Sequence, residues 1–412
     1  MYKFFSKEIN IIKNYPILLI TLSISFFLLI LFTLLWPIFR IRFGLINCDR
    51  IGHFSANTEL YLCNRLISKS YYFDIFYYPK SPVNQQLSIM VKRKLIILPK
   101  FFIRPLDLIS RKLSIFKRHR AITSLSGDHD ANNLLDKIPS QITMNKEELN
   151  LGYKLLKSIF GLKAKKKFIC LIVRDDAYLE KQWLNKGTMN FHTHRNIDIN
   201  NFYYAANELT KKGYYVFRMG SKVNKKFNTY NNKMIIDYAN SNFRTDFMDI
   251  FLMSNCFFCI STVTGLDAVS LMARKPILYL SSIPIGYYTT SSKKFMNCTR
   301  NHFYVKKNRN LKTSEIFKNS LAFSLDKRDF EKKKVILKNY TSKDIYNIAI
   351  EMLSYVKNNF KLNSKQKILN KKYWDNYNFL FRKYNKFNYH LHGNYDSVYS
   401  SYFLRNNYHH LK

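Results

Sequence analysis

The second half of the chain alternates short apolar runs with longer segments in which apolar residues recur every three or four positions. Apolar runs rich in branched and aromatic residues predict buried strands, and the three-to-four spacing predicts helices. The predicted order is strand 168–175, helix 201–213, strand 214–221, strand 234–239, helix 245–255, strand 257–261, helix 266–275 and strand 276–280. Strands that alternate with helices form a parallel sheet covered on both faces, so we expect an α/β fold.

A shorter series of alternating strands and helices is predicted in the first part of the chain. The segment 43–62 predicts a short strand, a loop at Gly52 and an amphipathic helix, and further strands at 74–79 and 94–99 each end at a proline. A basic helical stretch follows at 104–120. After it the chain is polar, and a helix over 140–160 is predicted with Thr143 as its cap. We expect a domain boundary near residue 150.

The run ILLITLSISFFLLILFTLLWPIF, residues 17–39, contains no charged residue. About 20 apolar residues cross the hydrocarbon core of a bilayer, so the run predicts one transmembrane helix after a short tail, 1–16. A cleaved signal peptide is the alternative, but the run is longer than a signal-peptide core and no small-x-small site follows it. Three lysines before the run balance three arginines after it, so charge does not orient the helix.

The net charge of the chain limits the kinds of partner it is expected to bind. Lys and Arg number 67 against 27 Asp and Glu, for a net charge of +40. Such an excess suits nucleic acid, an anionic membrane face or a phosphorylated ligand. The excess is spread along the whole chain, and the abundance of Lys, Asn, Ile, Tyr and Phe is equally compatible with codon bias. From about residue 361 the chain is basic and aromatic, which predicts either a stacking platform for nucleic acid or a helix packed on the domain with a disordered tail.

The six cysteines show no metal-ligand spacing. Cys256 and Cys259 form a C-x-x-C pair, but both lie within a predicted buried strand. A core position and a reduced compartment are therefore expected.

Small residues separate the predicted strand 257–261 from the predicted helix 266–275. A loop of this kind presents backbone N–H groups at a helix start, where an anion gains about 0.3–1 kcal/mol. Ligands of parallel sheets bind beyond the carboxyl ends of the strands. The residues expected along this rim are Arg174, Asp175, Asp176, Arg218, Met219, Gly220, Ser261, Thr262, Thr264 and Gly265.

Two arginines beside this loop predict a diphosphate site, because arginine offers a fixed fork of donors. A nucleotide-activated sugar would supply the diphosphate. The alternative is structural: Arg174 and Arg218 would then pair with Asp175, Asp176 or Asp246 at the edge of the sheet.

Six motifs in this order resemble a bacterial family of surface-carbohydrate glycosyltransferases: DRIGHFSANTELYL, VRDDAYL, HRNIDINNF, GYYVFRMGS, IIDYANS and TDFMDIFLMSNCFFCISTVTGLDAVSLMARKPILYL. The last block is also similar to the nucleotide-binding half of heptosyltransferases and of fucosyltransferases with the GT-B architecture. The resemblance covers roughly 43–300. It implies two Rossmann-like domains facing a cleft, with the acceptor on 43–150, the nucleotide-sugar on 151–330, and C-terminal helices and a tail at 331–412. It also implies that no catalytic metal and no cofactor is needed.

By this resemblance, Arg174 matches a basic residue near the donor phosphates, although Ile172 stands where the fucosyltransferases have a histidine. The other positions implied to bind the donor are Arg218, Gly220, Ser261, Thr262, Thr264 and Gly265. Arg195 and Asn196, in the HTHRN segment, are expected to contact substrate. His192 and His194 of this segment could bind metal, but no third ligand is visible.

A general base must reach the acceptor hydroxyl, and the candidates are Asp175, Asp176 and His53, with Glu59 as an alternative in a helix. The DHD motif at 128–130 matches the manganese motif of the other glycosyltransferase architecture, and a chance match in a polar loop is the simpler interpretation.

These patterns predict a membrane-anchored glycosyltransferase that transfers a sugar from a nucleotide-sugar to a surface polysaccharide or a lipid-linked glycan precursor. The expected location is the bacterial inner membrane, by a single-pass anchor, with the catalytic domain in the cytoplasm and no nucleic acid partner. The alternative is a non-catalytic, basic, membrane-tethered protein that binds an anionic polymer or nucleic acid.

Overall fold

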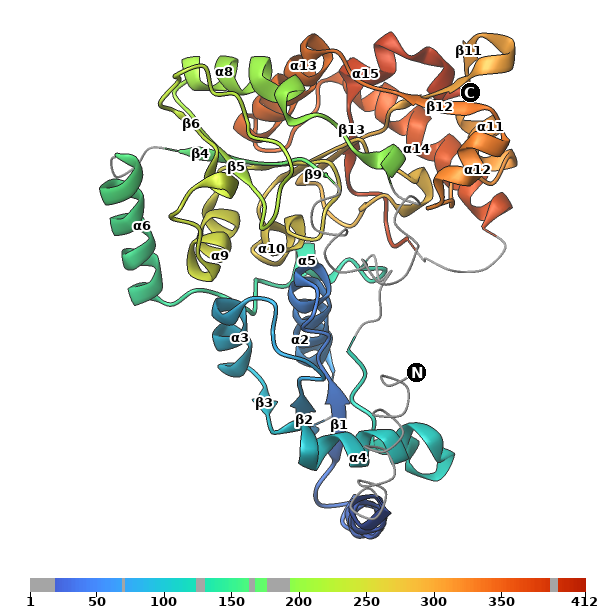
Figure 1. Ribbon diagram of the computed structural model, residues 1–412. Coiled ribbons are helices and arrows are strands. Elements are labelled where there is room, and N and C mark those ends of the chain that lie inside the picture. The colour runs from blue at the N-terminus through green and yellow to red at the C-terminus, as the bar shows by residue number, and fades with distance from the viewer. Residues whose placement is uncertain (1–18, 69–70, 124–129, 163–166, 176–192, 386–391) are drawn as a thin grey trace, which may run out of the picture. The chain divides into compact units, whose positions relative to one another are not determined.

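The computed structural model describes residues 19–68, 71–123, 130–162, 167–175, 193–385 and 392–412. The chain divides into two compact units, Met1–Leu125 and Ser126–Lys412, which we call unit 1 and unit 2 (Figure 1). The division falls before the predicted boundary near 150, so the polar segment after residue 125 belongs with the second unit.

Unit 2 is organised around a seven-stranded sheet in which every neighbouring pair is parallel. Its strands are β4 (Phe168–Ile172), β5 (Tyr215–Met219), β6 (Ile235–Ile236), β7 (Cys259–Ser261), β8 (Ile277–Leu280), β9 (Phe295–Cys298) and β13 (Val398–Tyr399). The order is β13-β9-β8-β7-β4-β5-β6. The six strands from β4 to β9 therefore follow the Rossmann order, with the first and fourth strands adjacent at the centre. The predicted α/β fold with a parallel sheet is confirmed.

Helices of unit 2 form where the apolar spacing predicted them. Thr245 caps α9 by accepting a hydrogen bond from Met248 N, and β4 is buried along its whole length. The helices along this part of the chain are α5 (Leu134–Lys137), α6 (Lys146–Phe160), η4 (Ile199–Phe202), α8 (Tyr203–Lys211), η5 (Tyr238–Asn240), α9 (Asp246–Asn255), α10 (Asp267–Met272) and η6 (Ile285–Tyr287).

Helix α6 belongs to unit 2 because it packs on α9. The rings of Tyr153 and Phe251 meet edge to face at 5.2 Å, and a Cβ at Gly152 would lie 2.1 Å from the Phe251 ring. The helix begins after Asn145, which forms a capping box with Glu148. The predicted cap at Thr143 was therefore two residues early, because Asn145 and Glu148 have the spacing that satisfies both backbone groups.

The C-terminal segment folds onto unit 2. Strand β13 pairs with β9 in the main sheet, and Tyr373, Tyr377 and Tyr399 are buried. The described part of 361–412 is therefore folded and does not form the predicted disordered tail, because aromatic residues of this segment belong to the core. The elements of this region are β10 (Asn301–Tyr304), η7 (Val305–Lys307), β11 (Arg309–Asn310), α11 (Thr313–Lys318), α12 (Lys327–Lys332), β12 (Val335–Lys338), α13 (Ser342–Lys357), α14 (Ser364–Tyr384), α15 (Ser401–Asn406) and η8 (Tyr408–Leu411).

Unit 1 is organised around a small sheet. Its described strands form a three-stranded parallel sheet in the order β1-β2-β3, and a single bridge joins Phe43 to Arg120 on the other side of β1. The elements are β1 (Ile41–Leu45), η1 (His53–Asn57), α2 (Thr58–Ile67), β2 (Phe73–Tyr77), α3 (Gln85–Lys92), β3 (Ile96–Ile97), α4 (Lys100–Lys112) and η2 (Ser114–His119).

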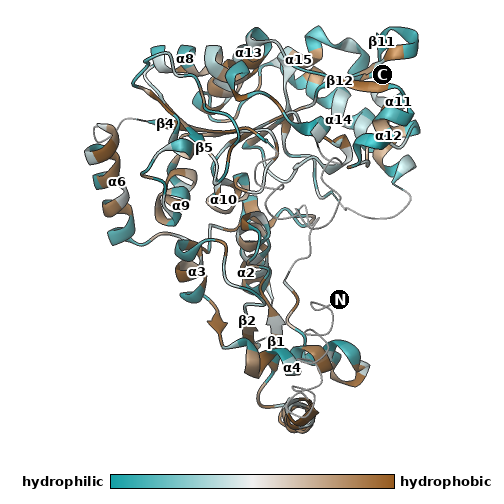
Figure 2. Ribbon diagram, viewed as in Figure 1, coloured by the Kyte–Doolittle hydropathy of each residue, from teal (hydrophilic) through white to brown (hydrophobic). Residues whose placement is uncertain are grey.

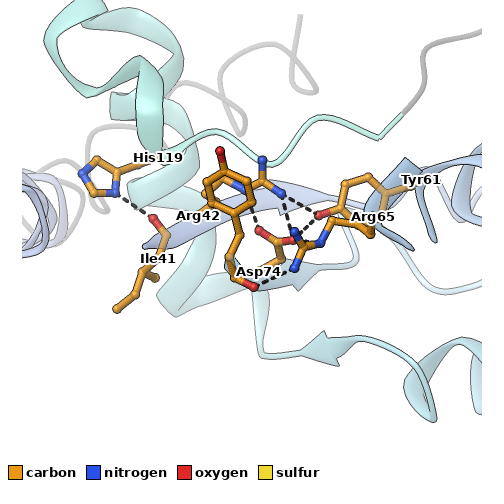
Figure 3. A network of polar contacts seen from close by, with 7 residues as sticks. Ile41, Arg42, Tyr61, Arg65, Asp74 and His119 are labelled. Atoms are coloured by element: carbon orange, nitrogen blue, oxygen red, sulfur yellow. Dashed lines mark hydrogen bonds and ion pairs between the residues drawn. The ribbon is translucent and has the colours of Figure 1, made fainter. Parts of the chain in front are cut away.

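A buried carboxylate, Asp74, joins three elements of unit 1 (Figure 3). It receives hydrogen bonds from Arg42 at 2.6 and 2.9 Å and from the Tyr61 hydroxyl, and it pairs with Arg65 at 2.8 Å. Burial, followed by the charge of Asp74, raises the pKa of Tyr61. The network ties β1, β2 and α2 together, because the Asp74 charge is stable in the interior only with these donors.

The uncharged run forms a helix over 19–34, followed by a turn at 35–38. Within the described residues, no helix combines the length and hydrophobicity needed to cross a membrane. The predicted transmembrane helix over 17–39 is therefore not what the described residues show; positions 17 and 18 lie outside them. The helix ends at Leu34, three residues before Pro37, which cannot continue the backbone hydrogen bonds of a helix.

Candidate functional site

The sheet of unit 2 reverses its strand order between β4 and β7, and in open parallel sheets ligands bind beyond the carboxyl ends at this point. Arg174 follows β4, and residues 262–265 follow β7. The Arg174 N–H donates to Thr262 Oγ1 at 2.7 Å, and Thr262 is buried. Two segments that the sequence placed on one rim are thus in direct contact.

The loop after β7 is closed by its own polar groups. The Ser261 hydroxyl donates to Asp267 at 2.5 Å, the Val263 N–H donates to Ser261 Oγ at 3.0 Å, and the Thr264 N–H donates to Asp267 at 2.9 Å. The backbone donors expected to face an anion at 263 and 264 are therefore already used, and Gly265 is exposed beside them. The Thr264 hydroxyl has no hydrogen-bond partner within the described residues.

Arg195 reaches the same loop. Its Nη2 donates to Val263 O at 3.3 Å, while its Nε is buried and has no partner in the described part of the chain. Burial, followed by the charges of Arg174 and Arg300, lowers the pKa of Arg195 to about 9, and Asp267 acts in the opposite direction. An arginine remains protonated at neutral pH, so this shift means that its positive charge is under-compensated. Asn196 continues the turn, since its N–H donates to Thr193 O at 3.0 Å.

Arg300, at the end of β9, completes a cluster of three arginines that we call the arginine cluster: Arg174, Arg195 and Arg300. Arg300 is buried, donates from Nη1 to Asn339 at 2.9 Å, and donates from Nη2 to the carbonyl of His194. It therefore holds the segment that carries Arg195 as well as adding charge. Sequence reasoning missed Arg300 because it follows a strand that lacked a clear apolar run, and no motif includes it.

Arg218 has a different environment. It is 1% exposed on β5, donates to Asp237 at 3.0 Å and lies 3.8 Å from Asp175. Of the partners predicted for a structural role, Asp175 lies beside Arg218, whereas the hydrogen-bonded partner Asp237 was not among them. Gly220 follows on the same strand end, where a Cβ would approach the Val223 side chain to 2.7 Å.

The candidate bases lie in both units. Asp175 accepts a hydrogen bond from Asn224 N at 3.0 Å besides its contact with Arg218. His53 is half-buried in η1 of unit 1; burial, followed by the charge of Arg50, lowers the pKa of His53, so its imidazole is neutral at pH 7 and can accept a proton. Glu59 is buried in α2. Asp176 lies outside the described residues.

Metal ligands are not gathered anywhere in the described ranges, where no group of three His, Cys, Asp or Glu residues could hold an ion. Asp130 of the DHD motif accepts hydrogen bonds from Leu134 N and Leu135 N, so its carboxylate caps α5. Asp128 and His192 lie outside the described residues. Cys256 and Cys259 are buried free thiols, which confirms their core position.

A cavity of about 720 Å³ lies at the opposite, amino-terminal ends of β4 and β8. It is lined by Lys167, Lys275 and Lys294 together with Tyr153 and Phe360. We do not assign it to the donor, because the carboxyl ends of the strands are the binding edge of such a sheet.

The fold and the site define an α/β protein with a Rossmann-type sheet and a cationic cluster at its switch point. No family model matches the chain, and no curated protein matches it. The solved structures similar to it include two that each have 12% identity and cover 77% of this chain and 98% of their own. They are a glycosyl transferase of family 9 from Veillonella parvula, with a TM-score of 0.45, and the ADP-heptose LPS heptosyltransferase II of E. coli, with a TM-score of 0.38.

Proposed function

We propose that the chain is a glycosyltransferase of the GT-B type that holds the diphosphate of a nucleotide-sugar at the carboxyl ends of β4 and β7. The observation that carries the proposal is the arginine cluster: Arg174 and Arg195 both contact the loop after β7, and Arg300 holds the segment that carries Arg195. A diphosphate brings two negative charges and several acceptor oxygens to this place.

Specific donors are available for those oxygens. The Arg195 Nε and the Thr264 Oγ1 are among the buried groups of the site that make no hydrogen bond within the described residues. A bound phosphate oxygen would satisfy both groups, and buried donors left without partners cost about 1–3 kcal/mol each. Arg174 contributes charge next to them, while Arg218 belongs to the framework.

The proposed reaction joins an acceptor hydroxyl to the anomeric carbon of the sugar. The new carbon–oxygen bond replaces the bond to the diphosphate, the nucleoside diphosphate leaves toward the arginine cluster, and the hydroxyl proton passes to a base. His53 is the proposed base because its imidazole is neutral, and Asp175 is the second candidate. The acceptor is proposed to be a surface polysaccharide or a lipid-linked glycan.

Turnover of a nucleotide-sugar panel tests the proposal against the non-catalytic alternative. The full chain is incubated with UDP-, GDP-, ADP- and CMP-linked sugars, with and without membrane lipid extract, and released nucleotide is measured. Release from one donor class, lost in Arg195→Gln and retained in the exposed control Lys211→Gln, supports a transferase. Tight donor-independent binding of polyanions without any release supports the alternative.

Metal independence is part of the proposal, because the arginine cluster supplies the positive charge that a metal would otherwise bring. Activity is expected to persist in EDTA. If EDTA abolishes all turnover and manganese restores it, the claim of metal independence is wrong. Donor binding by the arginine cluster is then tested by titration of the donor.

A further inference from the structure

One face of the helix over 19–34 packs against the rest of unit 1. Leu29 is fully buried in a cluster with Ile103 and Leu106 of α4, and the ring of Phe26 meets Phe116 of η2 edge to face at 5.6 Å. Thr33 Oγ1 lies 3.0 Å from a ring nitrogen of His119. These contacts fix which side of the helix faces the protein.

The opposite face of the same helix is apolar and exposed. Its residues follow the helical spacing i, i+4, i+7, i+11 and i+14, and their exposed fractions lie between 47% and 73%. They are Ile20, Ile24, Phe27, Leu31 and Leu34. A continuous apolar stripe of this length on a protein surface marks an interaction site rather than scattered surface residues.

Helix α4 extends this surface. Phe101 and Phe102 are 60% and 63% exposed at its start, and Ile115 is 67% exposed in η2. Figure 2 shows the helix over 19–34 in brown beside α4, on which brown and teal residues alternate. We call the exposed residues of 19–34, α4 and η2 the apolar face of unit 1.

Positive charge borders the apolar face. Residues 92–120 contain ten Lys and Arg and a single acidic residue, Asp107, which is buried and bonded to Arg111 and Tyr77. The exposed cations on α4 and η2 are Lys100, Arg104, Arg111, Lys112, Lys117 and Arg118. The guanidinium of Arg118 lies 5.6 Å from the ring of Trp36, so the charge adjoins the end of the N-terminal helix.

We propose that unit 1 docks on the surface of an anionic lipid bilayer through this face, with the helix over 19–34 lying along the lipid surface. Apolar residues enter the boundary between headgroups and acyl chains, and the bordering cations meet anionic headgroups. A second copy of the chain suits the face less well, because a two-fold interface would bring the same cations together. The proposal stands on unit 1 alone and does not depend on the proposed function.

Vesicle flotation of the full chain tests the proposal. The vesicles are phosphatidylcholine alone or phosphatidylcholine mixed with phosphatidylglycerol, and the expected result is binding to the anionic vesicles that weakens as salt is raised. Phe27→Ser combined with Leu31→Ser removes apolar contacts, and Lys112→Gln combined with Lys117→Gln removes charge. Each pair is expected to weaken binding at least about tenfold.

Matched controls lie on α14 of unit 2. Ile368 and Phe379 are 68% and 62% exposed there, and Lys365 and Lys367 are exposed cations. The same substitutions at these positions are expected to leave vesicle binding unchanged. Thermal melts of all variants check folding. If the double variant at Phe27 and Leu31 does not fold, the double variant at Lys112 and Lys117 tests the proposal by itself.

Three results overturn the proposal. The first is no binding of the wild-type chain to anionic vesicles, and the second is an equal loss in the α14 controls. The third is a dimer, seen by light scattering, that the Phe27 and Leu31 substitutions dissociate while lipid binding persists; a second copy would then be the occupant.

Discussion

Arg218, which the sequence placed in the donor site, is buried on β5 and bonded to Asp237. Its ion pair with Asp237 is enclosed, and removing one partner of a buried pair leaves an uncompensated charge. Arg218→Met is expected to lower the free energy of unfolding by about 3–5 kcal/mol, while the folded fraction binds the donor with nearly wild-type affinity. Chemical denaturation and donor titration measure the two effects. The exposed pair of Lys225 and Asp198 gives the control Lys225→Met, for which at most about 1 kcal/mol is expected.

If Arg218→Met instead binds the donor more weakly and is as stable as the wild type, Arg218 is a donor-binding residue and the structural assignment is wrong. The sequence could not decide between the two roles, because the partner Asp237 follows Arg218 by 19 residues along the chain.

Under the proposed function, Asp267 is expected to make donor binding depend on pH. Burial raises the pKa of Asp267 to about 6 in the folded chain, from an ordinary value of 3.8. Between these values the folded state keeps a proton that the unfolded state has lost, so this group's contribution to stability falls as the pH rises through the window. Below about pH 6 the neutral carboxyl no longer repels a diphosphate, and donor affinity is expected to rise roughly tenfold.

Calorimetric titration on both sides of pH 6 measures this change. Asp267→Asn is expected to abolish the pH dependence. Asp249→Asn is the control, because burial also raises the pKa of Asp249 to about 6 but its partners are Arg244 and Tyr238 rather than groups of the loop after β7. A pH dependence that survives Asp267→Asn and disappears in Asp249→Asn contradicts the assignment.

At the scale of elements, most of the main sheet could be predicted from the sequence. Strands β4, β5, β7 and β8 carry continuous apolar runs, and the helices between them carry the three-to-four spacing. Strand β13 could not be predicted, since its two residues take their place only by pairing with β9, about 100 positions earlier. Within the candidate site, the contact between Arg174 and the loop after β7 could be predicted, because both follow neighbouring strands. The position of Arg300 in the arginine cluster could not, because it depends on a tertiary contact with His194.

Helix α6 offers an element-scale prediction. A methyl group at Gly152 would collide with the buried Phe251 ring, so Gly152→Ala is expected to lower the stability of unit 2 by about 1–3 kcal/mol despite the better helix propensity of alanine. Hydrogen exchange should report lost protection in α6 and α9 and unchanged protection in α2. Ser158→Ala, at an exposed position of the same helix, is the control. Equal protection in Gly152→Ala and wild type would mean that α6 does not depend on α9.

At the scale of the whole molecule, the two units carry separate proposals. Unit 2 holds the arginine cluster on a Rossmann-type sheet, and unit 1 holds the apolar face and the proposed base His53. The two proposals assign part of the net charge of +40 to a diphosphate site and to a lipid-binding surface, and no nucleic acid partner is proposed. The cytoplasmic location of the proposed catalytic domain stays a prediction.

The central claim is that the arginine cluster binds the diphosphate of a nucleotide-sugar, and calorimetric titration of the full chain tests it most directly. One donor class is expected to bind, with affinity reduced at least about tenfold in Arg195→Gln, since a charged hydrogen bond contributes about 1.5–3 kcal/mol. Lys211→Gln, at an exposed position on α8, is expected to bind as the wild type does. The claim is contradicted if no nucleotide-sugar binds, or if Arg195→Gln remains folded and binds the donor as tightly as the wild type.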